Sequence, residues 1–176
     1  TDLFLPVIAL LEEKSGKSYD NDEEARKAMR IVADHIRTAT MLIGDENGIL
    51  PSNVGAGYIL RRLLRRAIRY ARKIGLDSSA LTAVSAIFID KIYDEAYPLL
   101  VEKKDYILSE IAKEADKFEA TLATGLKEFN KCIEGIKRKN EFMSAKDPAY
   151  KAENGINGKQ AFRLYDTFGF PVELTE

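Results

Sequence analysis

The chain has 176 residues, 45% of them hydrophobic, and its 27 Lys and Arg residues nearly balance its 28 Asp and Glu residues. That length allows one sizeable core, or one core with a small appendage. A single cysteine, Cys132, and the lack of any apolar run of about 18 residues exclude a disulfide, a cysteine metal cluster and a membrane-spanning helix within the chain. The start, Thr1 to Leu3, does not resemble a secretory signal, so we expect a soluble protein of the cytoplasm.

Apolar residues recur at intervals of three and four along most of the chain, which predicts an all-α fold of several helices, one of them long. We expect amphipathic helices over residues 3–14, 22–44, 58–74, 79–97 and 102–140. Ser78 is expected to cap the fourth of these helices, and Pro98 to separate it from the fifth. Gly125 and Gly135 are candidate bends in the fifth.

The segment 140–157 is polar and contains turn-forming pairs such as Asn154-Gly155, which predicts a loop or a short hairpin as a small appendage. The residues from Gly158 to Gly169 then favour a short helix that ends at glycine. Pro171 is suited to the first turn of a further helix.

Charge is strongly segregated in spite of the small net charge. An acidic stretch that includes Asp20 and Glu24 lies well before the basic helix, whereas no acidic residue occurs from Ile49 to Leu76. The helix expected in this second region contains the basic residues Arg61, Arg62, Arg65, Arg66, Arg69, Arg72 and Lys73. A concentration of positive charge that no neighbour cancels favours a polyanion as partner.

The spacing divides this basic helix into two faces. An apolar stripe, which would pack on the fold, consists of Leu60, Leu63, Leu64, Ala67, Ile68, Ala71 and Ile74. Most of the arginines then lie on the flanks and the back. Such a run can also be an ordinary solvated face whose arginines pair with acids of the same fold, but guanidinium doublets suit phosphate oxygens, which favours a phosphate-binding role.

A loop with glycines, residues 51–57, precedes the basic helix. Gly55 and Gly57 allow the backbone to approach a ligand closely, and Asn53 offers one hydrogen-bond acceptor and two donors. The loop lacks the Lys-Ser/Thr pair of a phosphate-binding P-loop, and no strand is expected before it. Chemistry alone favours Asn53 as a turn or capping residue.

No constellation of catalytic residues is evident within the chain. His35, the only histidine, lies within an apolar helical stripe, so a structural role is favoured. One histidine and one cysteine far apart cannot form a usual zinc site, and the acidic pairs on helix surfaces suit solvation and helix dipoles better than acid–base catalysis. We therefore expect no catalytic residue, no cofactor-binding residue and no metal ligand in this chain.

Several segments resemble, in order, the motifs of the alanyl-tRNA synthetase family. They are ADHIRTATMLIGD (33–45), LPSNVGAGYILRRLLRRAIRYARKIG (50–75), FEATLATGLKEF (118–129) and NGKQAFRLYDTFGFPVELTE (157–176). The opening residues also resemble the helix that follows the catalytic core of that family. In one departure, the position before Gly57 is often Arg in bacterial members and is Ala56 here, which removes one phosphate contact.

The resemblance implies a division into a tail helix, residues 1–20, and a helical tRNA-recognition domain, residues 21–176. In the family, the Asn of the PSN motif and the Asp of the LYDTFGFP motif recognise the G·U wobble pair in the acceptor stem of alanine tRNA. Those positions are Asn53 and Asp166 here, and they are expected to open onto one groove. An amide or carboxylate oxygen can accept from the guanine amino group in the minor groove. Without the resemblance, Asp166 would be interpreted as a capping or salt-bridged residue.

The resemblance further implies that the parent enzyme ligates alanine to tRNA with ATP and Mg²⁺, and that it carries a zinc-dependent editing site. The motifs for those activities would lie outside this chain, so the chain by itself is expected to be inactive and to bind the acceptor stem beside the catalytic and editing domains. Two alternatives remain: a helical module that binds an acidic protein through the basic helix, and a basic-helix DNA-binding protein. The loop at 51–57 does not suggest the helix-turn arrangement that the latter needs.

Overall fold

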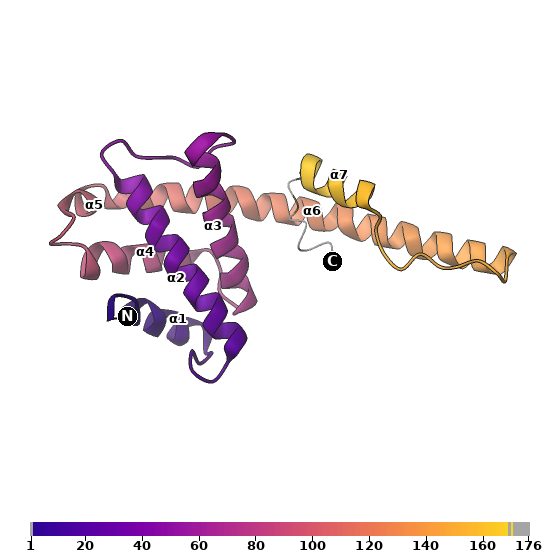
Figure 1. Ribbon diagram of the computed structural model, residues 1–176, viewed down its shortest axis with the longest axis horizontal. Helices are drawn as coiled ribbons and strands as arrows, with labels where there is room; N and C mark the ends of the chain where they lie inside the picture. The colour runs from indigo at the N-terminus through magenta and orange to yellow at the C-terminus, as the bar shows by residue number, and fades with distance from the viewer. Residues whose placement is uncertain (1, 169, 171–176) are drawn as a thin grey trace. The chain divides into compact units, whose positions relative to one another are not determined.

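The structure, a computed structural model, describes residues 2–168 and residue 170. Within this part of the chain every regular element is helical, which confirms the all-α prediction (Figure 1). The elements in chain order are η1 (Asp2–Phe4), α1 (Leu5–Ser15), α2 (Glu23–Gly44), α3 (Gly55–Lys73), α4 (Ser79–Ile87), η2 (Phe88–Ile92), α5 (Pro98–Glu102), α6 (Lys104–Lys146) and α7 (Gly158–Phe168).

Two of the expected helices are divided differently. The helix expected over 79–97 ends as α4 and continues as the π-helical turn η2, where Tyr93 donates from its backbone N–H to the Phe88 carbonyl at 2.9 Å. Pro98 does not separate two long helices but begins the short helix α5, since proline fits the first turn of a helix. The long helix α6 then extends beyond the expected end at residue 140.

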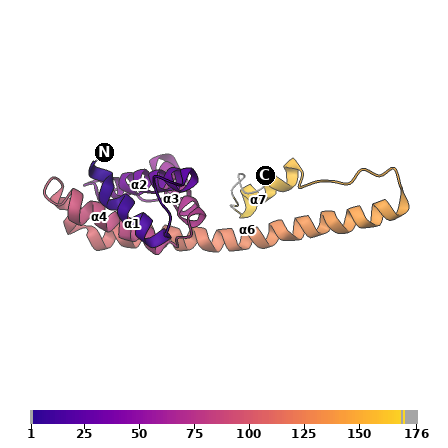
Figure 2. The same ribbon diagram turned by 90° about the horizontal axis from the view of Figure 1, so that it is seen from below.

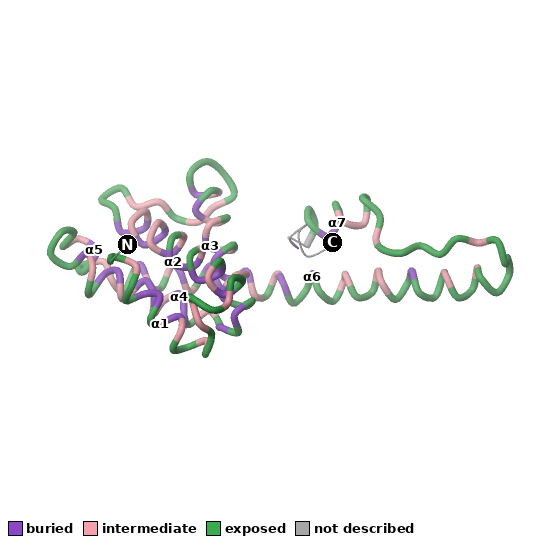
Figure 3. The backbone as a smooth tube through the Cα atoms, turned by 60° about the horizontal axis from the view of Figure 1, so that its bottom comes forward, coloured by how far each residue is buried: buried purple, intermediate pink, exposed green. Residues whose placement is uncertain are grey.

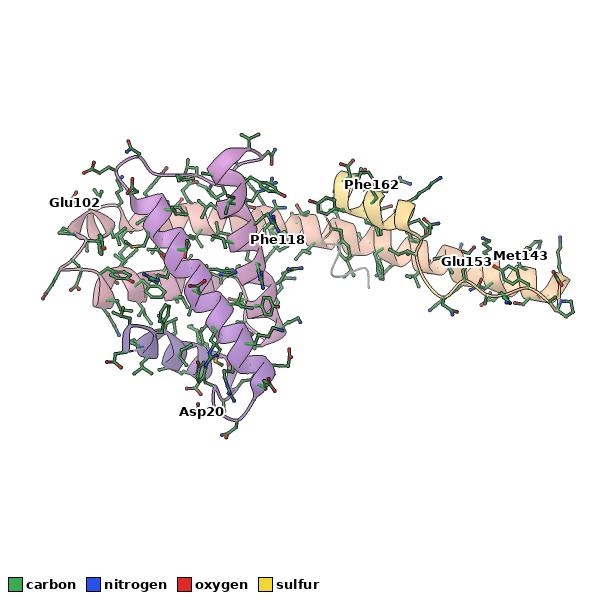
Figure 4. The ribbon with its side chains drawn as sticks, viewed as in Figure 1. Asp20, Glu102, Phe118, Met143, Glu153 and Phe162 are labelled. Atoms are coloured by element: carbon green, nitrogen blue, oxygen red, sulfur yellow. The ribbon has the colours of Figure 1, made fainter. Side chains whose placement is uncertain are left out.

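The appendage expected over 140–157 begins later than expected, because α6 occupies residues up to Lys146, and it is a loop rather than a hairpin, since no strand follows among the described residues. The remaining residues form a loop that returns along α6 (Figure 2). Asn140 holds this loop, since its Nδ2 donates to the Glu153 carbonyl at 2.8 Å and its Oδ1 accepts from the Glu153 backbone N–H at 3.0 Å. Lys139 also pairs with the Glu153 carboxylate, and Figure 4 labels Glu153 on this returning segment.

Acidic side chains cap two helices. The Asp22 carboxylate accepts from the Ala25 backbone N–H at 2.9 Å at the start of α2, and this hydrogen bond lowers the pKa of Asp22 below its ordinary value. The expectation that Ser78 caps α4 is wrong, because the Ser78 side chain makes no capping hydrogen bond. Asp77 accepts from the Ser79 hydroxyl and backbone N–H instead, which lowers the pKa of Asp77.

The chain forms two compact units, residues 1–116 and residues 117–176, and α6 contributes to both. The boundary expected between residues 20 and 21 lies inside the first unit. Within that unit, α1 packs on α2 and α4. That boundary refers to a parent enzyme and stays a prediction.

The first unit is built around α2 and α3, which lie side by side (Figure 1). Its buried residues come from α1 to α5 and from the first turns of α6, as the colouring of Figure 3 shows. Large side chains such as Met29, Leu60 and Phe88 are fully buried. Inside this core the hydroxyl oxygens of the buried Thr40 and Ser85 are 2.8 Å apart, so each has a hydrogen-bond partner.

In the second unit, α7 packs on the later part of α6. Phe170 stacks on the ring of Phe129, with centroids 5.9 Å apart, and it covers Gly125, where an added Cβ would lie 2.4 Å from the Phe170 ring. Gly125 therefore provides close packing. Leu164 of α7 is buried, whereas Phe162 of the same helix is exposed (Figure 4). Expectations about Gly169 and Pro171 fall on residues outside the described part of the chain.

Across the residues that the structure describes, none of the helices combines the length and apolar character that crossing a membrane requires.

Candidate nucleic-acid interface

The loop before α3 is a compact turn fixed by Ser52. The Ser52 backbone N–H donates to the Gly57 carbonyl at 3.0 Å, and its hydroxyl donates to the Val54 carbonyl at 2.9 Å. The same hydroxyl oxygen accepts from the Val54 backbone N–H at 3.3 Å. Asn53 thus lies between two residues whose positions are held by hydrogen bonds, and its side chain is exposed.

Both glycines of this turn are required by its geometry. Gly55, the first residue of α3, has φ of 56°, a left-handed conformation that side chains with Cβ rarely adopt. Gly57 is buried, and a Cβ there would lie 2.4 Å from both the Leu50 carbonyl oxygen and the Ser52 hydroxyl. The glycines expected to permit close approach to a ligand therefore permit close packing of the turn on itself.

Asn53 contacts the first basic residue of α3. The Arg61 guanidinium donates to Asn53 Oδ1, and the same guanidinium lies over the Tyr58 ring, with Cζ 5.4 Å from the ring centroid. Arg61 is half-buried. The Arg61 side chain of the basic helix therefore contacts the turn directly, through Asn53.

The apolar face of α3 packs as expected. Leu60, Leu64, Ala67, Ile68 and Ala71 are buried, and so is Ile74 just beyond the helix. Leu63 is the member of the expected stripe that is only half-buried. This packing fixes the opposite face toward solvent.

The residues on that opposite face, which we call the outer edge, are Arg62, Arg66 and Lys73. All three are exposed, and no acid among the described residues pairs with them. Each lies over an aromatic ring: Arg62 Cζ is 5.8 Å from the Tyr58 centroid, Arg66 Cζ 5.8 Å and Lys73 Nζ 5.3 Å from the Tyr70 centroid. These cation–π contacts restrict the cations without neutralising their charge.

Arg65, next to Arg66 in the sequence, has a different environment. Its Nε donates to Glu114 Oε1 of α6 at 2.7 Å, and the side chains are 25% and 5% exposed. This is the intramolecular ion pair that the sequence left open as an alternative for the arginines. Arg69 is half-buried and Arg72 is exposed, and both interact with other groups of the chain.

Asp166, the second residue expected to recognise a base, is exposed on α7. It belongs to residues 117–176, whereas Asn53 and α3 belong to residues 1–116. Asn53 and Asp166 therefore belong to different units, and their shared groove stays a prediction.

Sequence reasoning missed Tyr58 and Tyr70. Their spacing contained the signal, since each tyrosine is three or four residues from two basic residues, so the side chains share one side of the helix. It also missed two exposed apolar side chains near the start of α3, namely Val54, which follows Asn53 in the chain, and Ile59, which are 76% and 60% exposed.

His35 lies on α2 and is half-buried, with Nδ1 3.1 Å from Asp34 Oδ2. Its Nε2 is buried without a hydrogen-bond partner. In the described part of the chain, no group of three His, Cys, Asp or Glu side chains has an arrangement that could hold a metal ion.

A helical unit with an outer edge of exposed cations and an amide-bearing turn at the start of the same helix presents a surface of positive charge. Residues 1–176 match the model of the family described as tRNA synthetases class II (A). The chain belongs to this family.

The similar curated proteins all bear the name of one enzyme within this family. The chain is 42% identical over its full length to an alanine–tRNA ligase of Borrelia hermsii, of which it covers 27%. It is 43% identical to the alanine–tRNA ligase of Geobacillus kaustophilus and 44% identical to that of Halalkalibacterium halodurans, of which it covers 18% in each case. The chain thus spans about a quarter or less of the length of these relatives.

Proposed function

We propose that this chain is the acceptor-stem recognition part of an alanine–tRNA ligase and that it recognises a G·U wobble pair. The observation that supports the proposal most directly is the outer edge, where Arg62, Arg66 and Lys73 are exposed along the helix that begins at the fixed turn of Asn53. The relatives, which bear the name alanine–tRNA ligase, supply the substrate.

The two parts of this surface suit two kinds of contact. Arginines bind phosphate oxygens through paired donors, which positions the nucleic acid without identifying its sequence. From Arg62 to Lys73 the helix rises by roughly 16 Å, which is long enough to meet several phosphates of one strand. Asn53 would then lie at a base edge in the wide, shallow minor groove of A-form RNA. Asp166 would supply a second contact to the same base pair.

The parent enzyme in this proposal joins alanine to tRNA with ATP and Mg²⁺, acts in the cytoplasm, and edits its products at a zinc site. This chain contributes binding of the RNA, and the catalytic and editing domains of the same enzyme contribute the chemistry. Ala56, where bacterial members often have Arg, is exposed in the first turn of α3, so the surface has a position for one further phosphate contact.

The test measures binding of the 176-residue chain to three probes: an RNA minihelix with a G·U pair, the same minihelix with G·C, and a DNA duplex of matching sequence. We expect the wobble minihelix to bind more tightly than the G·C form by about 1–3 kcal/mol, and the DNA to bind through phosphates alone. Equal affinity for all three would overturn base recognition.

The rival function, binding of an acidic protein, is tested in the same titration with polyglutamate as competitor. Under the proposal, polyglutamate displaces RNA only at low ionic strength, because screening removes a purely electrostatic competitor. Tight binding of polyglutamate together with weak binding of every RNA would support the rival instead.

A further inference from the structure

The orientation of the Asn53 amide has a consequence for which atom of a base pair it can contact. An asparagine side chain has an oxygen that accepts hydrogen bonds and an NH₂ group that donates two. In this structure the oxygen is engaged, because Arg61 donates to Asn53 Oδ1. No described residue accepts a hydrogen bond from Asn53 Nδ2, and the residue is exposed.

Arg61 is itself held in place. It lies over the Tyr58 ring at 5.4 Å from the centroid and is half-buried at the start of α3. A guanidinium has only donors, so it cannot satisfy the NH₂ group of the amide, and the flipped orientation would place two donors against each other. Arg61 therefore selects one of the two amide orientations.

The backbone under Asn53 is held as well. Ser52 is bonded to Gly57 and Val54, and the buried Gly57 leaves no space for the turn to shift inward. With the backbone and the amide oxygen both fixed, the free NH₂ group is the part of Asn53 that remains available to a ligand.

We propose that Arg61 is a positioning residue that turns the Asn53 NH₂ group toward the RNA, so that Asn53 recognises a hydrogen-bond acceptor in the minor groove. This inference rests on the proposed function. The acceptors there are pyrimidine O2 and purine N3, whereas the guanine amino group is a donor. The assignment differs from the expectation, drawn from sequence, that the amide oxygen accepts from that amino group. A carboxylate such as Asp166 has no donor when ionised and stays the candidate for the amino group.

The decisive variant is Asn53→Asp. A carboxylate keeps the partnership with Arg61 and the size of the side chain but removes the donor. We expect Asn53→Asp to lower the ratio of affinities for the G·U and G·C minihelices toward one, as Asn53→Ala does. If the amide oxygen were the contact, Asn53→Asp would keep the ratio, and this result would overturn the inference.

Substituted RNA identifies the contact atom. Replacing uracil by 2-thiouracil weakens the O2 acceptor, replacing guanine by 3-deazaguanine removes N3, and replacing guanine by inosine removes the amino group. We expect one of the two acceptor changes to cost the wild-type chain about tenfold in affinity and the Asn53→Ala chain nothing. The inosine change is expected to cost both chains the same factor. If only the inosine change costs the wild-type chain more affinity than it costs the Asn53→Ala chain, the donor assignment is wrong.

Arg61 is tested by rescue. Arg61→Ala frees the amide to flip and is expected to lower the affinity ratio, while Arg61→Lys retains a donor for Oδ1 and restores part of the ratio. Arg62→Ala is the matched control, because Arg62 also lies over Tyr58 but does not contact Asn53, and it should lower affinity for both minihelices by one factor. Equal ratios in Arg61→Ala and wild type would overturn the positioning role.

Failure of the inference and failure of the proposed function have different signatures. If the wild-type chain does not distinguish the G·U from the G·C minihelix, the proposed function fails. If it does distinguish them and Asn53→Asp does so equally well, the proposed function stands and the donor assignment is wrong. Melting curves of each variant without RNA show whether the turn is still folded.

Discussion

The outer edge of α3 and the flank that contains Arg65 are formed by the same kind of residue and differ in what faces them. Arg65 meets Glu114, which is only 5% exposed, at 2.7 Å. Arg66, its neighbour in the chain, is exposed over the ring of Tyr70. One arginine therefore attaches α3 to α6 within the first unit, and the next is available to a ligand.

The comparison shows that a run of arginines is not one functional patch. Removing an arginine whose charge is met by a buried carboxylate destabilises the fold, because the carboxylate is left without compensation. An arginine over an aromatic ring keeps its full charge toward solvent. Four predictions test this division.

The largest effect is expected for the double variant Arg62→Ala/Arg66→Ala. It removes two phosphate contacts, which we expect to weaken binding of every minihelix by roughly 2–3 kcal/mol. The slope of log K against log salt concentration should fall in magnitude by about 1.4–1.8. Arg65→Ala is the matched control, and its slope should equal that of the wild type. Equal slopes for the double variant and the wild type would show that the outer edge is not the phosphate contact.

The next largest effect is expected on stability, at the ion pair between Arg65 and Glu114. Glu114→Gln removes the charge opposite Arg65 without changing the size of the side chain, and we expect unfolding to cost about 1–2 kcal/mol less, measured by urea denaturation. Glu102→Gln is the control, because Glu102 is exposed on α5 and its loss should change stability by no more than about 0.5 kcal/mol. Equal urea midpoints of unfolding for the two variants would show that the Arg65–Glu114 pair does not stabilise the fold.

A smaller effect on stability is expected at the turn around Asn53, which precedes α3. Gly57→Ala places a Cβ 2.4 Å from Leu50 and Ser52, which should cost about 1 kcal/mol and lower the discrimination between G·U and G·C minihelices. Gly135→Ala is the matched control. No atom lies within 4 Å of a Cβ there, within helix α6, so this change should stabilise the chain by about 0.5–1 kcal/mol. If the Gly57→Ala chain distinguishes the G·U and G·C minihelices as well as the wild type does, the shape of the turn is not required for recognition.

The smallest effect is expected for Tyr70→Leu. Leucine keeps an apolar side chain but removes the ring under Arg66 and Lys73, so these cations lose an orienting contact of about 0.5 kcal/mol. RNA affinity should fall by a factor of about two, measured by fluorescence anisotropy, with the salt slope unchanged because no charge is lost. A larger fall with a changed slope would indicate that Tyr70 contacts the RNA itself.

The sequence by itself determined the helical fold, the position of α3 and the polarity of its two faces. These features depend on local spacing, since side chains three and four residues apart share one side of a helix whatever surrounds it. The turn around Asn53 was also evident as a loop with glycines. The end of α6 and the path of 147–157 were not evident, and the returning segment is held by contacts between Asn140 and Glu153, which are 13 positions apart along the chain.

Only the tertiary structure decided the roles of individual residues. Arg65 and Arg66 are equivalent in sequence, and a buried carboxylate on α6, 49 positions from Arg65, separates them. The Asn53 amide has a defined donor face because α3 brings Arg61 beside it. Helical period assigns a residue to a face, whereas the charge and hydrogen-bond partners that meet it depend on which other helix packs there.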